Sequence, residues 1–154
     1  MTSRRALLAL TSMLVLERCA AGPPAPAVLT LTVHGGADQN PDPTGHPAPV
    51  PFELYQLSAT GRFDRADVFA LLDHQKETLA TDLLASEQFL IPPGQTKTIT
   101  RTLEKGTQFV GIAVLFRDID HATWRLTAPV AASGPTALTL GISGLKAKLA
   151  SGTS

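Results

Sequence analysis

Apolar and polar residues alternate in several short stretches of the chain, and this pattern predicts β-strands. Leu29, Leu31 and Val33 occupy alternate positions, so we expect them to share the buried face of one strand. The expected strands are Val28–Val33, Val50–Leu57, Phe89–Ile91, Thr96–Leu103, Gln108–Phe116, Thr123–Ala128, Thr136–Ser143 and Leu145–Leu149. Eight short strands separated by closely spaced turns predict an all-β domain built as a two-sheet β-sandwich.

Details of the strand pattern predict how the sandwich is packed. Gln108–Phe116 is almost continuously apolar, as expected of a central strand. The turn signal Pro92–Gln95 between two expected strands predicts a hairpin. Lys146 and Lys148 should point outward from the last strand, where they discourage edge-to-edge aggregation. The aromatic core candidates are Phe52, Phe89, Phe109, Phe116 and Trp124.

One segment, Asp64–Asp73, shows helical rather than strand periodicity. Phe63, Ala66, Phe69 and Leu72 recur at helical spacing, and Asp64 followed by Asp67 resembles an N-terminal cap. We therefore expect one short helical insertion that covers one end of the sandwich. Lys76–Ala85 is compatible with a further helical turn.

The N-terminal residues have the organisation of a secretory signal peptide. Arg4 and Arg5 precede the apolar run Ala6–Leu16, which is shorter than the ~18 residues needed to span a bilayer. We therefore expect residues 1–18 to be a lipoprotein signal peptide and exclude them from the fold. The alternative is a buried N-terminal helix.

Cys19 is the only cysteine of the chain and directly follows this segment. It resembles the lipid-attachment cysteine of bacterial lipoproteins, in which a diacylglycerol is joined to the sulfur and the new N-terminus is acylated. Glu17 and Arg18 depart from the small or apolar residues that precede that cysteine in lipoproteins. The alternative is ordinary cleavage after Ala21, which would release a soluble periplasmic protein. Residues 19–27 are rich in proline and are expected to form a tether.

Composition and motifs indicate a binding role rather than chemistry. The 154 residues suit one domain, and a formal net charge of zero argues against nucleic-acid binding. The sequence contains no Gly-x-Ser-x-Gly nucleophile elbow. The histidines, His34, His46, His74 and His121, are not spaced as a metal-binding pair. Asp118 and Asp120 are typical of a turn. We therefore expect no catalytic residue, metal, cofactor or small-molecule substrate.

The connection His34–Val50 is unusually long for a compact domain and holds four prolines and three glycines. Prolines stiffen a loop, which lowers the ordering cost of binding. We expect it to bind a partner protein; the alternative is a tolerated flexible insertion. The candidate contact residues are Asp38, Asn40, Pro41, Asp42, Pro43, Gly45, Pro47 and Pro49.

Several segments resemble the type VI secretion outer-membrane lipoprotein family (TssJ, VasD or SciN-like). They are Val28–Val50, Phe52–Leu57, Arg62–Asp73, Ile91–Ile99 and Phe109–Arg125. The resemblance implies a transthyretin-like β-sandwich over residues 28–150, followed by a tail at residues 151–154. It also implies an outer-membrane, periplasm-facing lipoprotein, anchored here by Cys19.

The partner implied by the resemblance is the periplasmic C-terminal region of the inner-membrane protein TssM (IcmF-like), contacted through the loop after the first strand. Ala20 is not the aspartate that retains lipoproteins in the inner membrane, which is compatible with outer-membrane sorting. The alternative function is a soluble periplasmic binding or accessory module without a lipid anchor. Transthyretin-like hydroxyisourate hydrolases end in Tyr-Arg-Gly-Ser, whereas this sequence ends in Ser-Gly-Thr-Ser.

Overall fold

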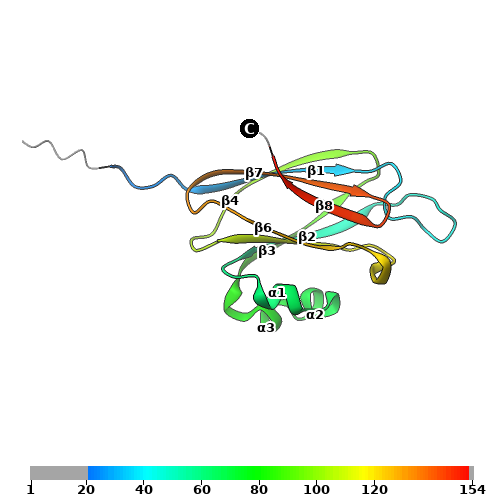
Figure 1. Cartoon of the computed structure of the whole chain (residues 1–154), viewed down its shortest axis with the longest axis horizontal. Coiled ribbons are helices and arrows are strands. Elements are labelled where there is room, and N and C mark those ends of the chain that lie inside the picture. The colour runs from blue at the N-terminus through cyan, green and yellow to red at the C-terminus, as the bar shows by residue number, and fades with distance from the viewer. Residues whose placement is uncertain (1–20, 153–154) are drawn as a thin grey trace, which may run out of the picture.

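The structure, a computed structural model that describes residues 21–152, contains two four-stranded sheets packed face to face (Figure 1). The strand order is β4-β1-β7-β8 in the first sheet and β3-β2-β5-β6 in the second. The strands are β1 (Ala27–Gly35), β2 (Val50–Leu57), β3 (Leu83–Ile91), β4 (Thr96–Thr102), β5 (Phe109–Val114), β6 (Arg125–Pro129), β7 (Gly134–Ser143) and β8 (Lys146–Ser151). The predicted eight-stranded sandwich is confirmed. The expected signal peptide and Cys19 lie outside the described residues.

Strand β1 occupies the interior of the first sheet, between β4 and β7. It pairs with β4 antiparallel and with β7 parallel, so that Leu31 lies beside both Ile99 and Leu138. The two sheets approach each other along the β6 and β8 edges. There Thr123 donates its N–H to Leu145 O at 2.9 Å and accepts from Ala147 N at 3.0 Å. This bridge closes one side of the sandwich.

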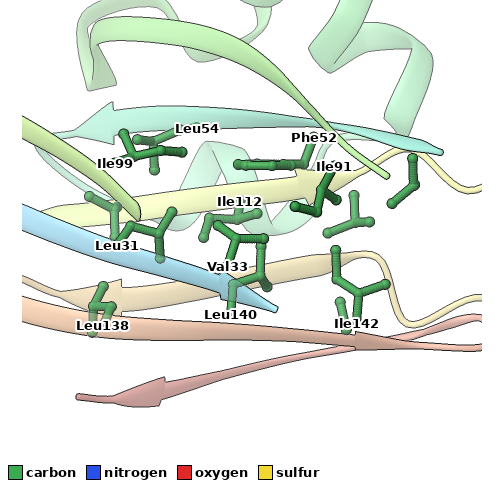
Figure 2. Close-up of a cluster of buried hydrophobic side chains, with 14 of the residues drawn as sticks. Leu31, Val33, Phe52, Leu54, Ile91, Ile99, Ile112, Leu138, Leu140 and Ile142 are labelled. Atoms are coloured by element: carbon green, nitrogen blue, oxygen red, sulfur yellow. The ribbon is translucent and has the colours of Figure 1, made fainter. Parts of the chain in front are cut away.

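The main hydrophobic core fills the space between the sheets. Leu29, Leu31 and Val33 all face it, as their alternation predicted. Figure 2 shows side chains from both sheets meeting in this layer, among them Phe52, Leu54, Ile91, Ile99, Ile112, Leu138, Leu140 and Ile142. Of the aromatic core candidates, Phe52 and Phe116 are buried, whereas Phe89, Phe109 and Trp124 are only partly buried.

A second apolar cluster lies on the outer face of the β3-β2-β5-β6 sheet, beneath the helices (Figure 1). These are α1 (Gly61–Arg65), α2 (Val68–Asp73), α3 (Gln75–Leu79) and the 3-10 turn η1 (Ala80–Asp82). Tyr55 and Leu57 point into the cluster, and the Tyr55 ring lies 5.3 Å from the Phe63 ring. The expectation that the helical insertion covers one end of the sandwich is therefore wrong: it covers a sheet face. Alternate residues of β2 thus serve two different cores.

The single helix predicted over Asp64–Asp73 is in fact two short helices. Ala66 adopts an extended backbone between them, and Asp67 caps α2 by accepting a 2.9 Å hydrogen bond from Ala70 N. The Arg125 guanidinium donates to the carbonyl oxygens of Asp64 and Ala66, which fixes this break. The predicted Asp64–Asp67 cap is thus wrong, because Asp64 lies inside α1.

The break also rotates the buried face of the second helix. Val68 and Leu71 are buried, whereas Phe69, which helical spacing placed on the buried face, is 67% exposed. Further along, α3 and η1 provide the helical structure expected after Lys76. Strand β3 begins at Leu83, so helical structure ends before Ala85.

The predicted hairpin around Pro92–Gln95 is wrong, although a turn is present. Strands β3 and β4 belong to different sheets, so the turn carries the chain from one sheet to the other. Proline and glycine favour chain reversal in either arrangement, and the sequence signal does not distinguish them. The two edge strands are linked instead by side chains: Arg101 forms a 2.7 Å ion pair with Glu87 and lies over the Phe89 ring. Within residues 21–152, no helix is long and apolar enough to span a bilayer.

Candidate partner-binding site

The long connection between β1 and β2, residues 36–49, emerges at the end of the sandwich opposite to the proline-rich tether (Figure 1). We call it the proline loop. Its base is pinned to both sheets, because Gly36 N donates to Ile142 O at 2.7 Å and the fully buried Gln39 amide donates to Ile91 O at 2.7 Å. The Gln39 amide also donates to Ala48 O at 3.3 Å. The loop therefore leaves the domain from a fixed position.

Asn40 joins three neighbouring connections at this base. Its amide nitrogen donates to Pro49 O, its amide oxygen accepts from Arg117 N, both at 2.9 Å, and its backbone N–H donates to Gly144 O at 2.8 Å. Its φ of +48° lies in the left-handed region, which asparagine tolerates better than most residues. Only 2% of Asn40 is exposed, so it shapes the loop and does not itself present a contact surface.

The tip of the proline loop is ordered around the carboxylate of Asp42. Its Oδ1 accepts hydrogen bonds from the Thr44 hydroxyl at 2.6 Å, Thr44 N at 2.8 Å and His46 N at 3.0 Å. The hydroxyl bond, followed by the His46 backbone bond, lowers the pKa of Asp42. Asp42 N also donates to His46 O at 2.8 Å, and Gly45 makes the tight turn with a φ of +88°. The tip is therefore a compact, self-bonded turn.

The predicted contact residues divide into an exposed and a supporting group. Pro43, Gly45, Pro47 and Pro49 are exposed, and Pro41 and Asp42 are half-buried. Asp38 is exposed as well and accepts a hydrogen bond from the Ser143 hydroxyl at 3.1 Å. The partner-binding role of these residues stays a prediction.

Sequence reasoning missed two parts of this end of the molecule. Gln39 is a pin of the loop base, but a glutamine in a polar connection carries no signal of burial. A groove of about 610 Å³ also separates the tip from the β5–β6 connection and the β7–β8 turn. It is lined by Pro41, Asp42, Pro43, Arg117, Asp118 and Leu145. Neither neighbour of the loop is close to it in sequence.

His121 and Asp118, at the same end of the molecule, are exposed and paired with each other. In the connection after β5, which contains the 3-10 turn η2 (Ile119–His121), His121 Nδ1 lies 2.7 Å from Asp118 Oδ1. The hydrogen bond to Asp118 raises the pKa of His121. Among residues 21–152, no group of three or more His, Cys, Asp or Glu side chains could hold a metal ion. The arrangement offers a pre-shaped contact surface.

Comparison with known proteins finds a matching family and similar solved structures. Residues 27–145 match the family described as type VI secretion lipoprotein, VasD, EvfM, TssJ. The crystal structure of the T6SS lipoprotein TssJ1 from Pseudomonas aeruginosa is 32% identical, with a TM-score of 0.81 over 84% of this chain and 98% of that chain. No curated protein sequence matches the chain.

Two further solved structures share the fold. Serratia marcescens Lip, a membrane-bound component of the type VI secretion system, is 23% identical, with a TM-score of 0.72 over 84% of this chain and all of that chain (100%). A chain in the structure of the T6SS protein TssM C-terminal domain from EAEC is 25% identical, with a TM-score of 0.67 over 80% of this chain and 98% of that chain.

Proposed function

The chain belongs to the type VI secretion lipoprotein family, and from this premise we propose that it binds the periplasmic C-terminal region of TssM through the exposed tip of the proline loop. The observation that carries the proposal is the combination of an exposed tip with a buried, hydrogen-bonded base at Gln39 and Asn40. The similar chain in the EAEC TssM C-terminal domain structure supports the choice of partner.

The order of the proline loop is what makes it suited to binding. A flexible segment loses conformational freedom when it binds, at a cost of roughly 0.5–1.5 kcal/mol per immobilised side chain. Here the prolines and the Asp42 turn remove much of that freedom before the partner arrives. In this proposal the tip of the proline loop and the neighbouring groove supply the contact, with no covalent step and no cofactor.

The anchor is the second part of the proposal. Lipid on Cys19 would hold the domain on the periplasmic face of the outer membrane, since each buried methylene of an acyl chain contributes about 0.8 kcal/mol. Mass spectrometry of the mature N-terminus should find an acylated Cys19, and Cys19→Ser should release the protein from membranes. A mature protein that begins at Gly22 and remains in the soluble periplasmic fraction would support the alternative, a module without an anchor. Density-gradient separation of inner and outer membranes tests the placement.

A shortened tip tests the loop. Asp42 N and His46 O are hydrogen-bonded, so the chain enters and leaves this segment at adjacent points. A Gly-Gly connection between Pro41 and Pro47 can therefore replace residues 42–46. We expect affinity for the purified TssM region to fall at least tenfold by calorimetry, about 1.4 kcal/mol. The unfolding temperature should stay within a few degrees of the parent value. Lys105→Ala, at the opposite end of the sandwich, is the matched control; unchanged affinity of the shortened variant would remove the loop from the interface.

A further inference from the structure

A groove of about 840 Å³ lies at the end of the sandwich opposite to the proline loop. It is bounded by the tether at Pro24–Pro26, by the β4–β5 connection and by the β6–β7 connection. Apolar groups dominate its lining, with Leu103, Phe109 and Val130 among them. We call the surface formed by residues 21–27, 103–109 and 129–135 the tether end.

The tether end is almost free of charge. Its three segments contain two charged residues, Glu104 and Lys105, whose charges cancel. The proline-loop end is different, because its exposed connections carry charged side chains: Asp38, Arg117, Asp118, Asp120 and Lys146. The two ends of the sandwich, which lie at opposite sides of Figure 1, therefore differ in charge, and the end beside the tether is neutral.

The last residues of the tether are hydrogen-bonded to this end of the sandwich. Gly134 N donates to Pro26 O at 3.1 Å and approaches Ala25 O at 3.4 Å, which fixes the last residues of the tether against the start of β7. Cys19 is five positions before Pro24, and five fully extended residues span at most about 18 Å. A lipid on Cys19 would thus bring the bilayer surface close to the tether end.

We propose that the tether end lies directly against the headgroup region of the bilayer that holds the Cys19 lipid, with Pro129–Ala132 and the tether prolines in contact with it. This inference rests on the proposed lipid anchor. The exposed residues of Pro129–Ala132 and of the tether are small, so the contact is weak by itself. The anchor makes it intramolecular and thereby raises its effective concentration. Because the surface is neutral, the contact requires no anionic lipid and is insensitive to salt. The proline loop then points away from the membrane, toward the periplasm.

Fluorescence quenching on the lipidated full chain tests this orientation. Ala131→Cys and Thr44→Cys would each carry an environment-sensitive fluorophore, the acylated Cys19 sulfur being blocked as a thioether. In vesicles of phosphatidylcholine with brominated acyl chains, we expect at least threefold stronger quenching at position 131 than at position 44. The ratio should be the same at 0.1 M and 0.5 M salt.

The outcomes separate this inference from the anchor itself. If the protein floats with the vesicles but position 131 is quenched no more than position 44, the tether holds the domain away from the bilayer and the inference is wrong. If the protein does not float, the anchor fails and the orientation fails with it. A second variant, Ala132→Asp, should halve quenching at position 131 without altering flotation, whereas the matched change Pro43→Asp at the loop tip should leave it unchanged.

Discussion

The side-chain oxygen of Asn40 accepts a 2.9 Å hydrogen bond from the backbone N–H of Arg117, which joins the proline loop to the connection after β5. The same side chain donates to Pro49 O, on the far arm of the loop. One buried amide therefore sets the position of the loop relative to its groove. The exposed tip contributes the contact surface, but Asn40 decides where that surface lies.

Substitution of Asn40 should separate its two contributions. Asn40→Ala removes both side-chain hydrogen bonds and leaves a side chain with a left-handed φ, so we expect a loss of about 2–4 kcal/mol of unfolding free energy. Asn40→Gly removes the same bonds without the backbone strain and should lose about 1 kcal/mol less. Urea unfolding measures both. Equal stabilities of the two variants would contradict a role for backbone strain, and parent-like stability of both would contradict the clamp.

Two glycines in the sheets offer a matched test of helix packing. A Cβ added at Gly111 would lie 2.9 Å from Phe63 Cζ, so Gly111→Ala should force the ring to move and cost about 1–3 kcal/mol. A Cβ at Gly141 would meet nothing within 4 Å, so Gly141→Ala should be neutral or stabilising by up to about 1 kcal/mol. The unfolding temperature should fall for Gly111→Ala and stay unchanged or rise for Gly141→Ala. A neutral Gly111→Ala would show that α1 is not held tightly against β5.

Phe63 and Phe69 have similar spacing in the sequence pattern but opposite environments in the fold. Phe63 lies on the inner face of α1 and is fully buried, so its truncation to alanine should lower the unfolding free energy by about 3–5 kcal/mol. Phe69 is mostly exposed on α2, so Phe69→Ala should change the unfolding free energy by no more than about 0.5 kcal/mol. Denaturant unfolding of both proteins checks the contrast. A large loss at Phe69 would contradict the break between α1 and α2.

Glu53 should make stability depend on pH. Burial raises its pKa, an effect that a hydrogen bond to Ser86 partly opposes, and no ion pair within residues 21–152 involves it. Because the folded state favours the protonated form, this contribution to stability is present below the ordinary glutamate pKa of 4.5 and is lost as pH rises through the raised value.

Glu53→Gln should therefore be more stable than the parent at pH 7.5, by on the order of 1 kcal/mol, and close to it at pH 4. Urea unfolding at the two pH values measures the difference. The matched control is Glu104→Gln, because Glu104 is exposed at the tether end. An equal gain at both pH values would contradict the assignment to ionisation.

The strands were predictable because their faces are chemically distinct. In β1, Leu29, Leu31 and Val33 meet only the core, so the alternation of residue types is a direct record of burial. In β2 the same logic holds on both faces, since Phe52 enters one core and Tyr55 the other. The break between α1 and α2 was not predictable from local spacing. It depends on Arg125, a residue of β6 that reaches two carbonyl oxygens across the sheet face.

The candidate site divides in the same way. Pro41, Pro43 and Pro47 identify the loop, because prolines in a long connection restrict it locally. Its support could not be predicted, because Gln39 and Asn40 contact Ile91 and Arg117, which are distant in sequence. The acceptor at Ile91 is its backbone carbonyl, which every residue has, so the identity of this side chain does not mark it as a hydrogen-bond partner. The crossing of Pro92–Gln95 between sheets has the same origin in long-range packing.

The place of β1 inside the first sheet constrains how the domain is made. Its parallel neighbour β7 follows β2 to β6 in the sequence, so Leu31 has no partner on that side until Leu138 is available. Strand β1 can pair with β4 earlier, but its other edge stays unpaired until β7 is available. The first sheet is therefore completed only when β7 lies alongside β1, so its assembly depends on long-range pairing and is a late step of folding.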